Sequence, residues 1–312
     1  MTKQIEDSLE KIPILNWIML LVKKVKIPGL MGMSLYDVLE MYIIGIAKGA
    51  LTSRAGGIAF SFFMALFPFL LFILTLIPFV PIEGFQSDFL FMIDQLLPPK
   101  TSESVQDVIN DIAINRYGGL MSFGFIASIF LMTNGVNAIL GGFEYSYHVN
   151  EMRNTFRQYI ISIGMSILFA VILVITVILV IYFEIGVSRL KLKGWVDDDV
   201  FWIDWGRILF FTLLLFVSVS FLYNYGTKSM KFKSFFTPGS VLTTVLTLLM
   251  FKVFAIYVEK FATYNELYGS IGTLLILMLF VWLNAIILLL GFELNASIKR
   301  LRRFHLRQKI NK

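Results

Sequence analysis

Long apolar segments of membrane-spanning length recur along the chain, and they constrain its fold more than any other feature. A helix needs about twenty mostly apolar residues to cross the hydrocarbon core of a bilayer. Inside lipid, every backbone polar group must be satisfied within the protein, which favours helices. The sequence therefore predicts an all-α bundle of six transmembrane helices, at residues 58–79, 119–143, 157–183, 205–225, 238–258 and 268–297.

Composition agrees with a polytopic membrane protein that has one membrane domain, at residues 55–298. Of the 312 residues, 57% are hydrophobic and only 15% are charged, whereas about a quarter of the residues in a soluble domain are charged. The chain has no cysteine, which excludes disulfides, thiolate metal ligands and cysteine nucleophiles.

The segments between and around the spans are shorter or more polar. Residues 1–54 are expected to hold interfacial helices, at residues 12–22 and 34–50, because these runs are apolar or amphipathic and too short to span. Three further segments are expected outside the bilayer: a small helical cap at 82–117, an external loop at 184–204 and a basic tail at 299–312.

The distribution of positive charge predicts the orientation of the bundle. With six spans, both termini lie on one side. Nineteen Lys and Arg residues fall in segments on that side and seven on the other. Such an excess marks the cytoplasmic face, so we expect both termini in the cytoplasm. The basic flanks are also expected to attract anionic lipid headgroups there.

Polar side chains inside the spans are the first candidates for function, because burying an unsatisfied polar group in a membrane is costly. They either form hydrogen bonds and ion pairs that hold the helices together, or line a polar cavity that opens to the cytoplasm. Pro68 lies inside the first span and is expected to kink it. The candidate cavity residues are Asn134, Asn137, Asn284, Glu144, Glu293 and Asn295.

A short internal similarity links the second and last spans. Gly142-Phe143-Glu144 ends one of them, and Gly291-Phe292-Glu293 lies near the end of the other. The similarity indicates either a repeat about an axis along the membrane normal or a coincidence among glycine-rich helices. A carboxylate at a helix C-terminus is unfavourable unless a cation compensates it. We therefore expect both glutamates to face a shared polar space, with Arg54, Arg153 or Arg157 as partners.

A polar and aromatic cluster opens the last span. Aromatic side chains there would anchor the helix at the headgroups, and the small residues would let another backbone approach closely. A second interpretation is an external gate. The cluster consists of Tyr264, Asn265, Tyr268, Gly269, Ser270 and Gly272.

This cluster, together with the Gly-x-Glu-Leu-Asn-Ala run at 291–296, resembles the signature of the YihY/BrkB family. Blocks at 55–71 and 137–147 and the Pro238-Gly239 pair agree with it, so the resemblance covers about residues 34–303. It implies a bacterial inner-membrane protein of a family once labelled ribonuclease BN. Members are associated with envelope integrity and serum resistance, and one with lipopolysaccharide export.

The residues themselves do not favour the nuclease label. His148 and His305 lack a metal-ligand partner at helical or loop spacing, and residues 197–199 are expected to be a solvated acidic loop. The chain contains no Walker, Gly-x-Ser-x-Gly or dinucleotide-binding motif. We expect no catalytic residue, metal, cofactor or nucleic-acid partner.

Two functions follow as hypotheses. The first is translocation of a lipid-like or small amphiphilic substrate, which a lateral groove lined by the span amides would favour. The second is a non-transporting envelope scaffold that recruits partners, which a tightly packed bundle would favour. An intramembrane enzyme is the weakest alternative because the sequence shows no nucleophile–base pair. The oligomeric state, a homo-oligomer included, is left open.

Overall fold

The computed structural model describes residues 34–76, 78, 117–149, 152–192, 199–228, 235–260 and 270–310. The predicted helix at 12–22 and nearly all of the predicted cap at 82–117 lie outside them. The described residues form an all-α bundle, as the sequence predicts. Its helices are α3 (Leu35–Lys48), α4 (Leu51–Leu76), α7 (Gly118–Glu144), α8 (Thr155–Leu192), α9 (Asp199–Tyr225), α10 (Pro238–Lys260) and α12 (Ser270–Ile310).

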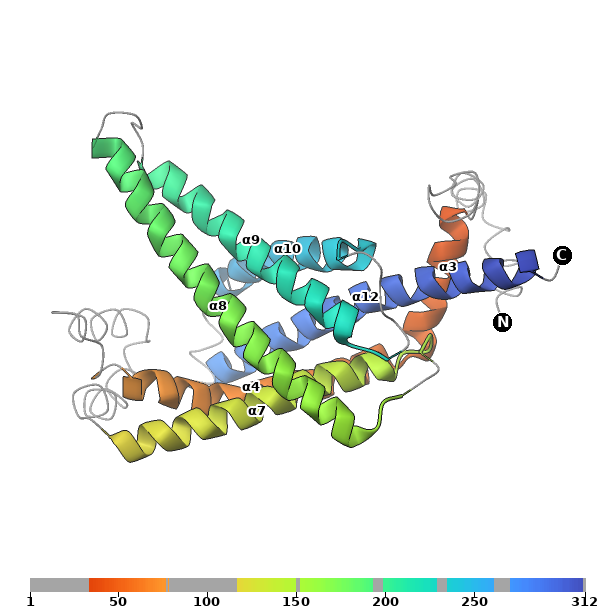
Figure 1. Ribbon diagram of the computed structural model, residues 1–312, viewed down its shortest axis with the longest axis horizontal. Coiled ribbons are helices and arrows are strands. Elements are labelled where there is room, and N and C mark those ends of the chain that lie inside the picture. The colour runs from red at the N-terminus through yellow and green to blue at the C-terminus, as the bar shows by residue number, and fades with distance from the viewer. Residues whose placement is uncertain are drawn as a thin grey trace.

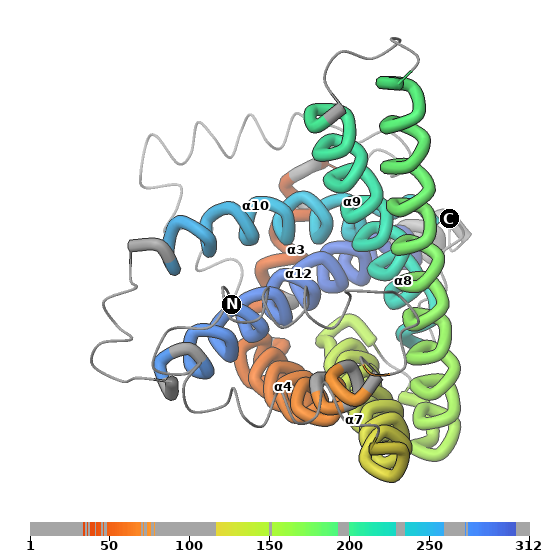
Figure 2. Tube along the Cα trace, turned by 90° about the vertical axis from the view of Figure 1, so that its left-hand side faces the viewer, coloured from red at the N-terminus to blue at the C-terminus, as the bar shows by residue number. Residues whose placement is uncertain are grey.

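The last helix, α12, runs through the middle of the bundle (Figure 1). It packs against α3, α4 and α10, and Figure 2 shows these helices around it in a view turned by 90°. Helices α4 and α7 lie side by side along most of their length, and α8 and α9 form a second pair that diverges from them. The two pairs converge where α7 ends and α8 begins.

Local sequence explains where the helices begin. Pro238 occupies the first turn of α10, where its missing N–H costs nothing. The Thr237 hydroxyl accepts a hydrogen bond from the Ser240 N–H at 3.2 Å, and the Ser240 hydroxyl accepts one from the Thr237 N–H at 3.1 Å. This reciprocal pair is a capping box. At the start of α8, the Asn154 side chain accepts from the Phe156 N–H at 3.2 Å, another N-cap.

Five helices within the described residues are long and apolar enough to cross a membrane: α7, α8, α9, α10 and α12. They coincide with the second to sixth predicted spans. The first predicted span corresponds to α4, which has 26 residues and continues as a helix through Pro68. A total of six spans stays a prediction, as does the kink at Pro68.

Most of the predicted external loop at 184–204 is helical, so the loop is wrong there, while its position outside the bilayer stays a prediction. Helix α8 continues to Leu192, and α9 already begins at Asp199. Across these two helices, Arg207 Nε lies 2.7 Å from Glu184 Oε1. Hydropathy falls where a helix leaves the bilayer, whereas the helix itself continues as long as its residues favour it. For the same reason α12 extends to Ile310, through most of the predicted basic tail.

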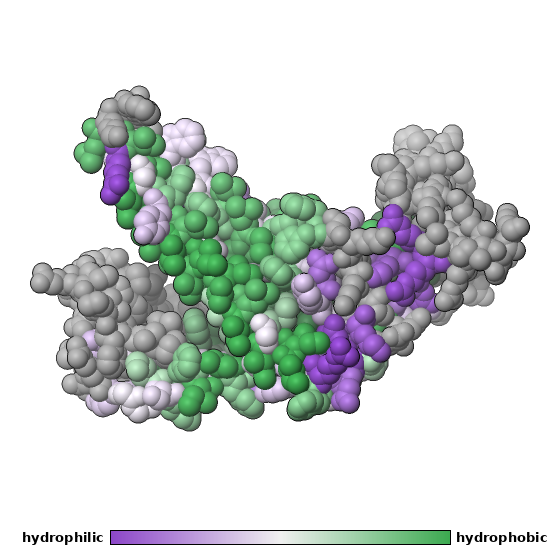
Figure 3. Space-filling view, in the orientation of Figure 1, coloured by the Kyte–Doolittle hydropathy of each residue, from purple (hydrophilic) through white to green (hydrophobic). Residues whose placement is uncertain are grey.

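The exterior of the bundle is apolar over a broad band. Between residues 171 and 182, helix α8 exposes large apolar side chains over most of its surface, and only the stripe at residues 172, 176 and 180 is half-buried. The whole helix buries only four residues. Figure 3 shows this band, with hydrophilic side chains gathered toward the end of the molecule that holds α3. We call this end the basic end and define it by Arg54, Arg153 and residues 299–303. An apolar exterior of this kind suits lipid rather than water.

Three aromatic rings form the centre of the core near the basic end. The rings of Phe143 and Phe292 stack with centroids 4.3 Å apart, and Tyr223 packs against both. All three side chains are fully buried. The Tyr223 hydroxyl bonds with Thr243 of α10 and donates to the Leu288 carbonyl of α12 at 2.7 Å. The two Gly-Phe-Glu triplets therefore meet at the point where α7, α9 and α12 are joined.

Candidate functional site

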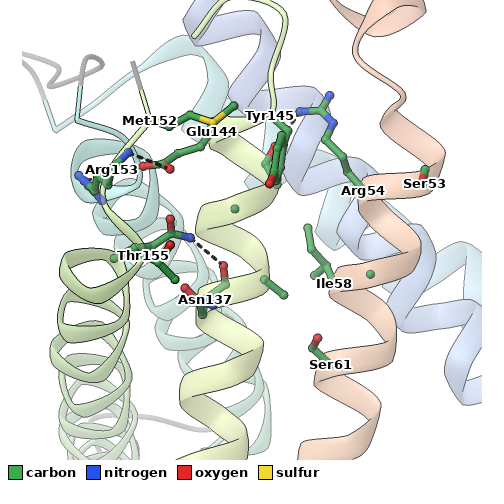
Figure 4. Close-up of a pocket in the computed structure, with 15 residues that line it drawn as sticks. Ser53, Arg54, Ile58, Ser61, Asn137, Glu144, Tyr145, Met152, Arg153 and Thr155 are labelled. Carbon is green, nitrogen blue, oxygen red and sulfur yellow. Dashed lines mark hydrogen bonds and ion pairs between the residues drawn. The ribbon is translucent and has the colours of Figure 1, made fainter. Parts of the chain in front are cut away.

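A cavity of about 530 Å³ lies near the basic end (Figure 4). It is lined by residues of α4, of α7 and of the start of α8 with the segment that leads into it. Small, polar and charged side chains provide most of its lining. The lining residues are Ser53, Arg54, Gly57, Ile58, Ser61, Asn137, Ala138, Gly141, Gly142, Glu144, Tyr145, Met152, Arg153, Thr155 and Gln158.

One wall of the cavity is a stripe of small residues on α4. Ser53, Gly57 and Ser61 follow one another at intervals of four residues, so they share one face of the helix. A Cβ added at Gly57 would meet no atom within 4 Å. The stripe therefore leaves open space that a ligand of modest width can enter.

The cavity's second wall and floor come from α7 and α8. The Asn137 carbonyl accepts a hydrogen bond from Gln158 Nε2 at 3.4 Å, and its side-chain oxygen accepts one from the Ser162 hydroxyl at 3.4 Å. With its amide turned over, Gln158 donates instead to Glu144 Oε2 at 3.1 Å. These polar contacts hold α7 and α8 together on the side of the cavity away from α4.

A short ion pair fixes one charged residue in the cavity wall. Arg54 Nη2 lies 2.7 Å from Glu293 Oε1, and the two side chains are 7% and 0% exposed. The other carboxylate oxygen accepts from the Ser146 hydroxyl at 2.8 Å. Arg54 Nη1 donates to the Gly142 carbonyl at 2.7 Å. Glu293 itself lies behind Arg54 and is not part of the cavity lining.

A second, longer ion pair lies in the cavity lining itself. Arg153 Nε is 4.0 Å from Glu144 Oε1, and both side chains are less than a tenth exposed. The Arg153 backbone N–H donates to Glu144 Oε2 at 3.2 Å. The guanidinium donates instead to the carbonyls of Tyr225 at 2.7 Å and Gly226 at 3.3 Å. Figure 4 shows Arg153 and Glu144 together beside the cavity.

Two titratable groups outside the membrane helices reflect this environment. Burial, and to a lesser extent the Glu293 carboxylate, raise the pKa of Tyr42 to about 12. The hydroxyl is therefore protonated at neutral pH. Burial lowers the pKa of Arg153, and the Glu144 carboxylate acts in the opposite direction. Arginine starts from so high a pKa that it keeps its charge.

The structure separates the predicted cavity residues into two groups. Asn137 and Glu144 line the cavity. Asn284 is half-buried on α12 and donates to the Phe280 carbonyl of its own helix at 2.9 Å. Asn295 is buried, accepts from the Gly239 N–H at 2.8 Å and donates to Thr237 at 2.8 Å. Asn134 is half-buried and lies outside the cavity lining.

The predicted gate cluster falls mostly on residues that the structure does not describe. Tyr264, Asn265, Tyr268 and Gly269 lie outside the described residues. Ser270 begins α12, and Gly272 is buried in its first turn. The gate stays a prediction.

The two glutamates pair with two of the three arginines that the sequence nominates. Glu293 pairs with Arg54 and Glu144 with Arg153, while Arg157 is exposed. Neither carboxylate faces the lipid headgroups, because both are buried. They contribute differently to the polar space, since only Glu144 lines the cavity directly.

Sequence reasoning missed the α4 wall and Gln158. The signal for the wall was present, because Ser53, Gly57 and Ser61 repeat every four residues in a predicted helix. Gln158 is a polar residue in the first turn of a span, a position common to many membrane helices. Nothing in its local sequence indicates that it faces a cavity.

Comparison with known proteins places the chain in a family. The family model described as virulence factor BrkB matches residues 45–312, which include the whole cavity lining. The chain belongs to the BrkB family. It is 32% identical to the ribonuclease-like protein YfkH of Bacillus subtilis (strain 168), over 80% of this chain and 90% of that protein.

Other BrkB relatives carry the description UPF0761 membrane protein. One from Pseudoalteromonas translucida (strain TAC 125) is 28% identical over 82% of this chain and 84% of its own length. One from Coxiella burnetii (strain Dugway 5J108-111) is 27% identical over 76% of this chain and 84% of its own length. No solved structure shows a significant match. Together with the apolar helices, these relatives identify a multi-pass membrane protein of the BrkB family.

Proposed function

We propose that this membrane protein binds a lipid-like amphiphile in the cavity and moves it across the bacterial inner membrane. In this proposal the basic end and both termini face the cytoplasm. The observation that carries the proposal is the cavity of about 530 Å³, which is lined by both polar and apolar groups and contains two arginines and a glutamate. It lies at one end of helices with an apolar exterior. Pockets of about 300–1,000 Å³ accommodate small organic ligands.

The α7 side of the cavity offers a path for an apolar chain. Asn134, Phe130 and Phe123 continue the α7 face of Asn137 at helical spacing. The two phenylalanine side chains are 55% and 65% exposed. A headgroup in the polar cavity would therefore leave its acyl chains beside an apolar surface, which is the arrangement that an amphiphile requires.

The scaffold hypothesis receives less support, because a tightly packed bundle without a cavity would favour it. The proposal also makes the protein a transporter or binder rather than an enzyme. One BrkB relative carries a ribonuclease-like name. In this chain the cavity brings together Arg, Glu, amide and hydroxyl groups, without a histidine or cysteine among its lining residues.

Filling the cavity tests the proposal. Gly57 lines the cavity and Gly56 does not, and a Cβ at either position meets no atom within 4 Å. Both positions therefore have room for a Cβ, and of the two leucine substitutions only Gly57→Leu adds a side chain to the cavity wall. In vesicles containing the purified protein, we expect the unmodified chain and Gly56→Leu to speed the crossing of a fluorescent short-chain phospholipid. Gly57→Leu should reduce crossing to the rate of protein-free vesicles.

Two results would contradict the proposal. One is an unmodified chain that does not speed crossing, and the other is equal activity of Gly57→Leu and Gly56→Leu. The orientation has its own test. Reporter fusions after Arg303 should read cytoplasmic and fusions at Ser102 external, and the reverse pattern would place the cavity in the outer leaflet.

A further inference from the structure

Glu144 has an unfilled hydrogen-bonding site beside the cavity. Among the described residues, no donor bonds to its buried Oε1 atom. The Arg153 guanidinium lies 4.0 Å away and directs its Nη atoms to the carbonyls of Tyr225 and Gly226. A buried carboxylate oxygen without a donor is costly, so a ligand that brings an N–H group to this atom binds with a gain.

Arg54 has the opposite requirement. Its Nη atoms are occupied by Glu293 and the Gly142 carbonyl. Its Nε atom is buried without an acceptor within the described part of the chain. The cavity wall thus combines one unmatched donor with one unmatched acceptor, on α4 and α7 respectively.

The charged side chains of the cavity lining and its ion pairs balance. Within the described residues, Arg54 and Arg153 lie in its lining together with Glu144, and Glu293 pairs with Arg54 from behind. The two positive and two negative side chains leave no net charge. A purely anionic headgroup would give the cavity a net negative charge, whereas a headgroup with one charge of each sign keeps it neutral and meets both the unmatched donor and the unmatched acceptor.

Building on the proposed function, we propose that the cavity selects a zwitterionic headgroup that carries a phosphate and a primary ammonium. The ammonium donates to Glu144 Oε1, and a phosphate oxygen accepts from Arg54 Nε. An aminophospholipid and free phosphoethanolamine share this chemistry. A trimethylammonium headgroup has the same charges but lacks N–H donors, so it leaves the Glu144 oxygen unsatisfied.

The test is a headgroup series on the full chain in detergent, measured by native mass spectrometry. The probes are phosphatidylethanolamine, phosphatidylcholine and phosphatidylglycerol with identical acyl chains. We expect phosphatidylethanolamine to bind about tenfold more tightly than the other two, which corresponds to one charge-assisted hydrogen bond. Glu144→Gln should reduce its affinity to that of phosphatidylcholine. The control Glu184→Gln changes a half-buried carboxylate on α8 that pairs with Arg207 and lies outside the cavity lining, and it should have no effect.

The outcomes separate this inference from the proposed function. Equal binding of the three lipids, or an unchanged preference in Glu144→Gln, overturns the headgroup assignment. If Gly57→Leu still abolishes binding in that case, the cavity remains the site. If Gly57→Leu leaves all binding intact, the cavity itself is wrong. If Glu144→Gln still binds phosphatidylcholine, its binding site is intact. If that variant does not fold, the lipid series on the unmodified chain decides the headgroup assignment.

Free phosphoethanolamine distinguishes the two sources of the ligand. If the lipid is the ligand, the soluble compound should displace it only weakly, because it lacks the chains that contact the apolar α7 face. Displacement at an affinity equal to that of the lipid would identify a soluble ligand and overturn the role of that face.

Discussion

The two Gly-Phe-Glu triplets use the same residues for different purposes. At Glu293 the carboxylate has a short bond to Arg54 and a second bond to Ser146. At Glu144 the nearest guanidinium atom is 4.0 Å away, and one oxygen lacks a donor among the described residues. Both carboxylate oxygens of Glu293 therefore accept hydrogen bonds, whereas only one oxygen of Glu144 does so within the described part of the chain. The difference indicates that Glu293 holds the helices and that Glu144 is available to a ligand.

The difference arises from where each arginine is placed. Arg54 lies within α4, which packs along α7 and against α12, so its guanidinium reaches two helices at once. Arg153 lies in the segment before α8, and the carbonyls at the end of α9 hold its guanidinium. The stacked rings of Phe143 and Phe292 bring the triplets together, and the arginines then distinguish them.

The largest effect should follow from Glu293→Gln. It leaves the Arg54 charge buried without a counter-ion, a change that typically costs about 3–5 kcal/mol. We expect a matching loss in the free energy of unfolding, measured by denaturant titration in detergent. The double variant Arg54→Glu/Glu293→Arg should recover part of this loss. Unchanged stability of Glu293→Gln would mean that this pair is not the structural one.

A substitution of the glycine should likewise destabilise the protein more in the Glu293 triplet than in the Glu144 triplet. A Cβ at Gly291 would strike the Gly239 carbonyl, Thr243 and Tyr223, including rigid backbone. A Cβ at Gly142 would lie 3.0 Å from the flexible end of Ile58 and 3.3 Å from that of Leu289. Overpacking costs about 1–3 kcal/mol.

We therefore expect Gly291→Ala at or above the upper end of this range and Gly142→Ala near the lower end. Thermal unfolding of the two variants in the same detergent measures the difference. Equal losses would remove the structural distinction between the triplets.

Glu144→Gln should have the smallest effect on stability. The amide keeps the shape of the side chain, and the Arg153 guanidinium keeps its two carbonyl partners, so the free energy of unfolding should change by less than about 1 kcal/mol. The crossing of phosphatidylethanolamine in vesicles should nevertheless fall about tenfold. A large loss of stability together with recovery in an Arg153 charge swap would make this pair structural as well.

The sequence predicts the bundle well because hydrophobic length is a local property. Five of the expected spans match described membrane-length helices, and Pro238 marks the start of α10 as expected. It also nominates Arg54 and Arg153 as partners of the glutamates, because charge compensation leaves few candidates at that end. The prediction of a loop at 184–204 is wrong because hydropathy indicates contact with lipid and does not indicate where a helix ends.

The cavity depends on information that the sequence does not hold locally. Asn137, Asn284 and Asn295 are all amides near the same end of the bundle, yet only Asn137 lines the cavity. Asn284 bonds to its own helix and Asn295 joins α10 to α12. Which amide lines the cavity depends on the rotation of each helix against its neighbours, and side-chain packing sets that rotation.

The most direct test is to locate a bound lipid by photo-crosslinking. A phosphatidylethanolamine analogue with a photoreactive group near its headgroup, bound to the unmodified chain, should crosslink to peptides that contain residues 53–61 and 137–145. Crosslinks confined to the exposed apolar face of α8, at residues 171–182, would contradict the cavity as the binding site.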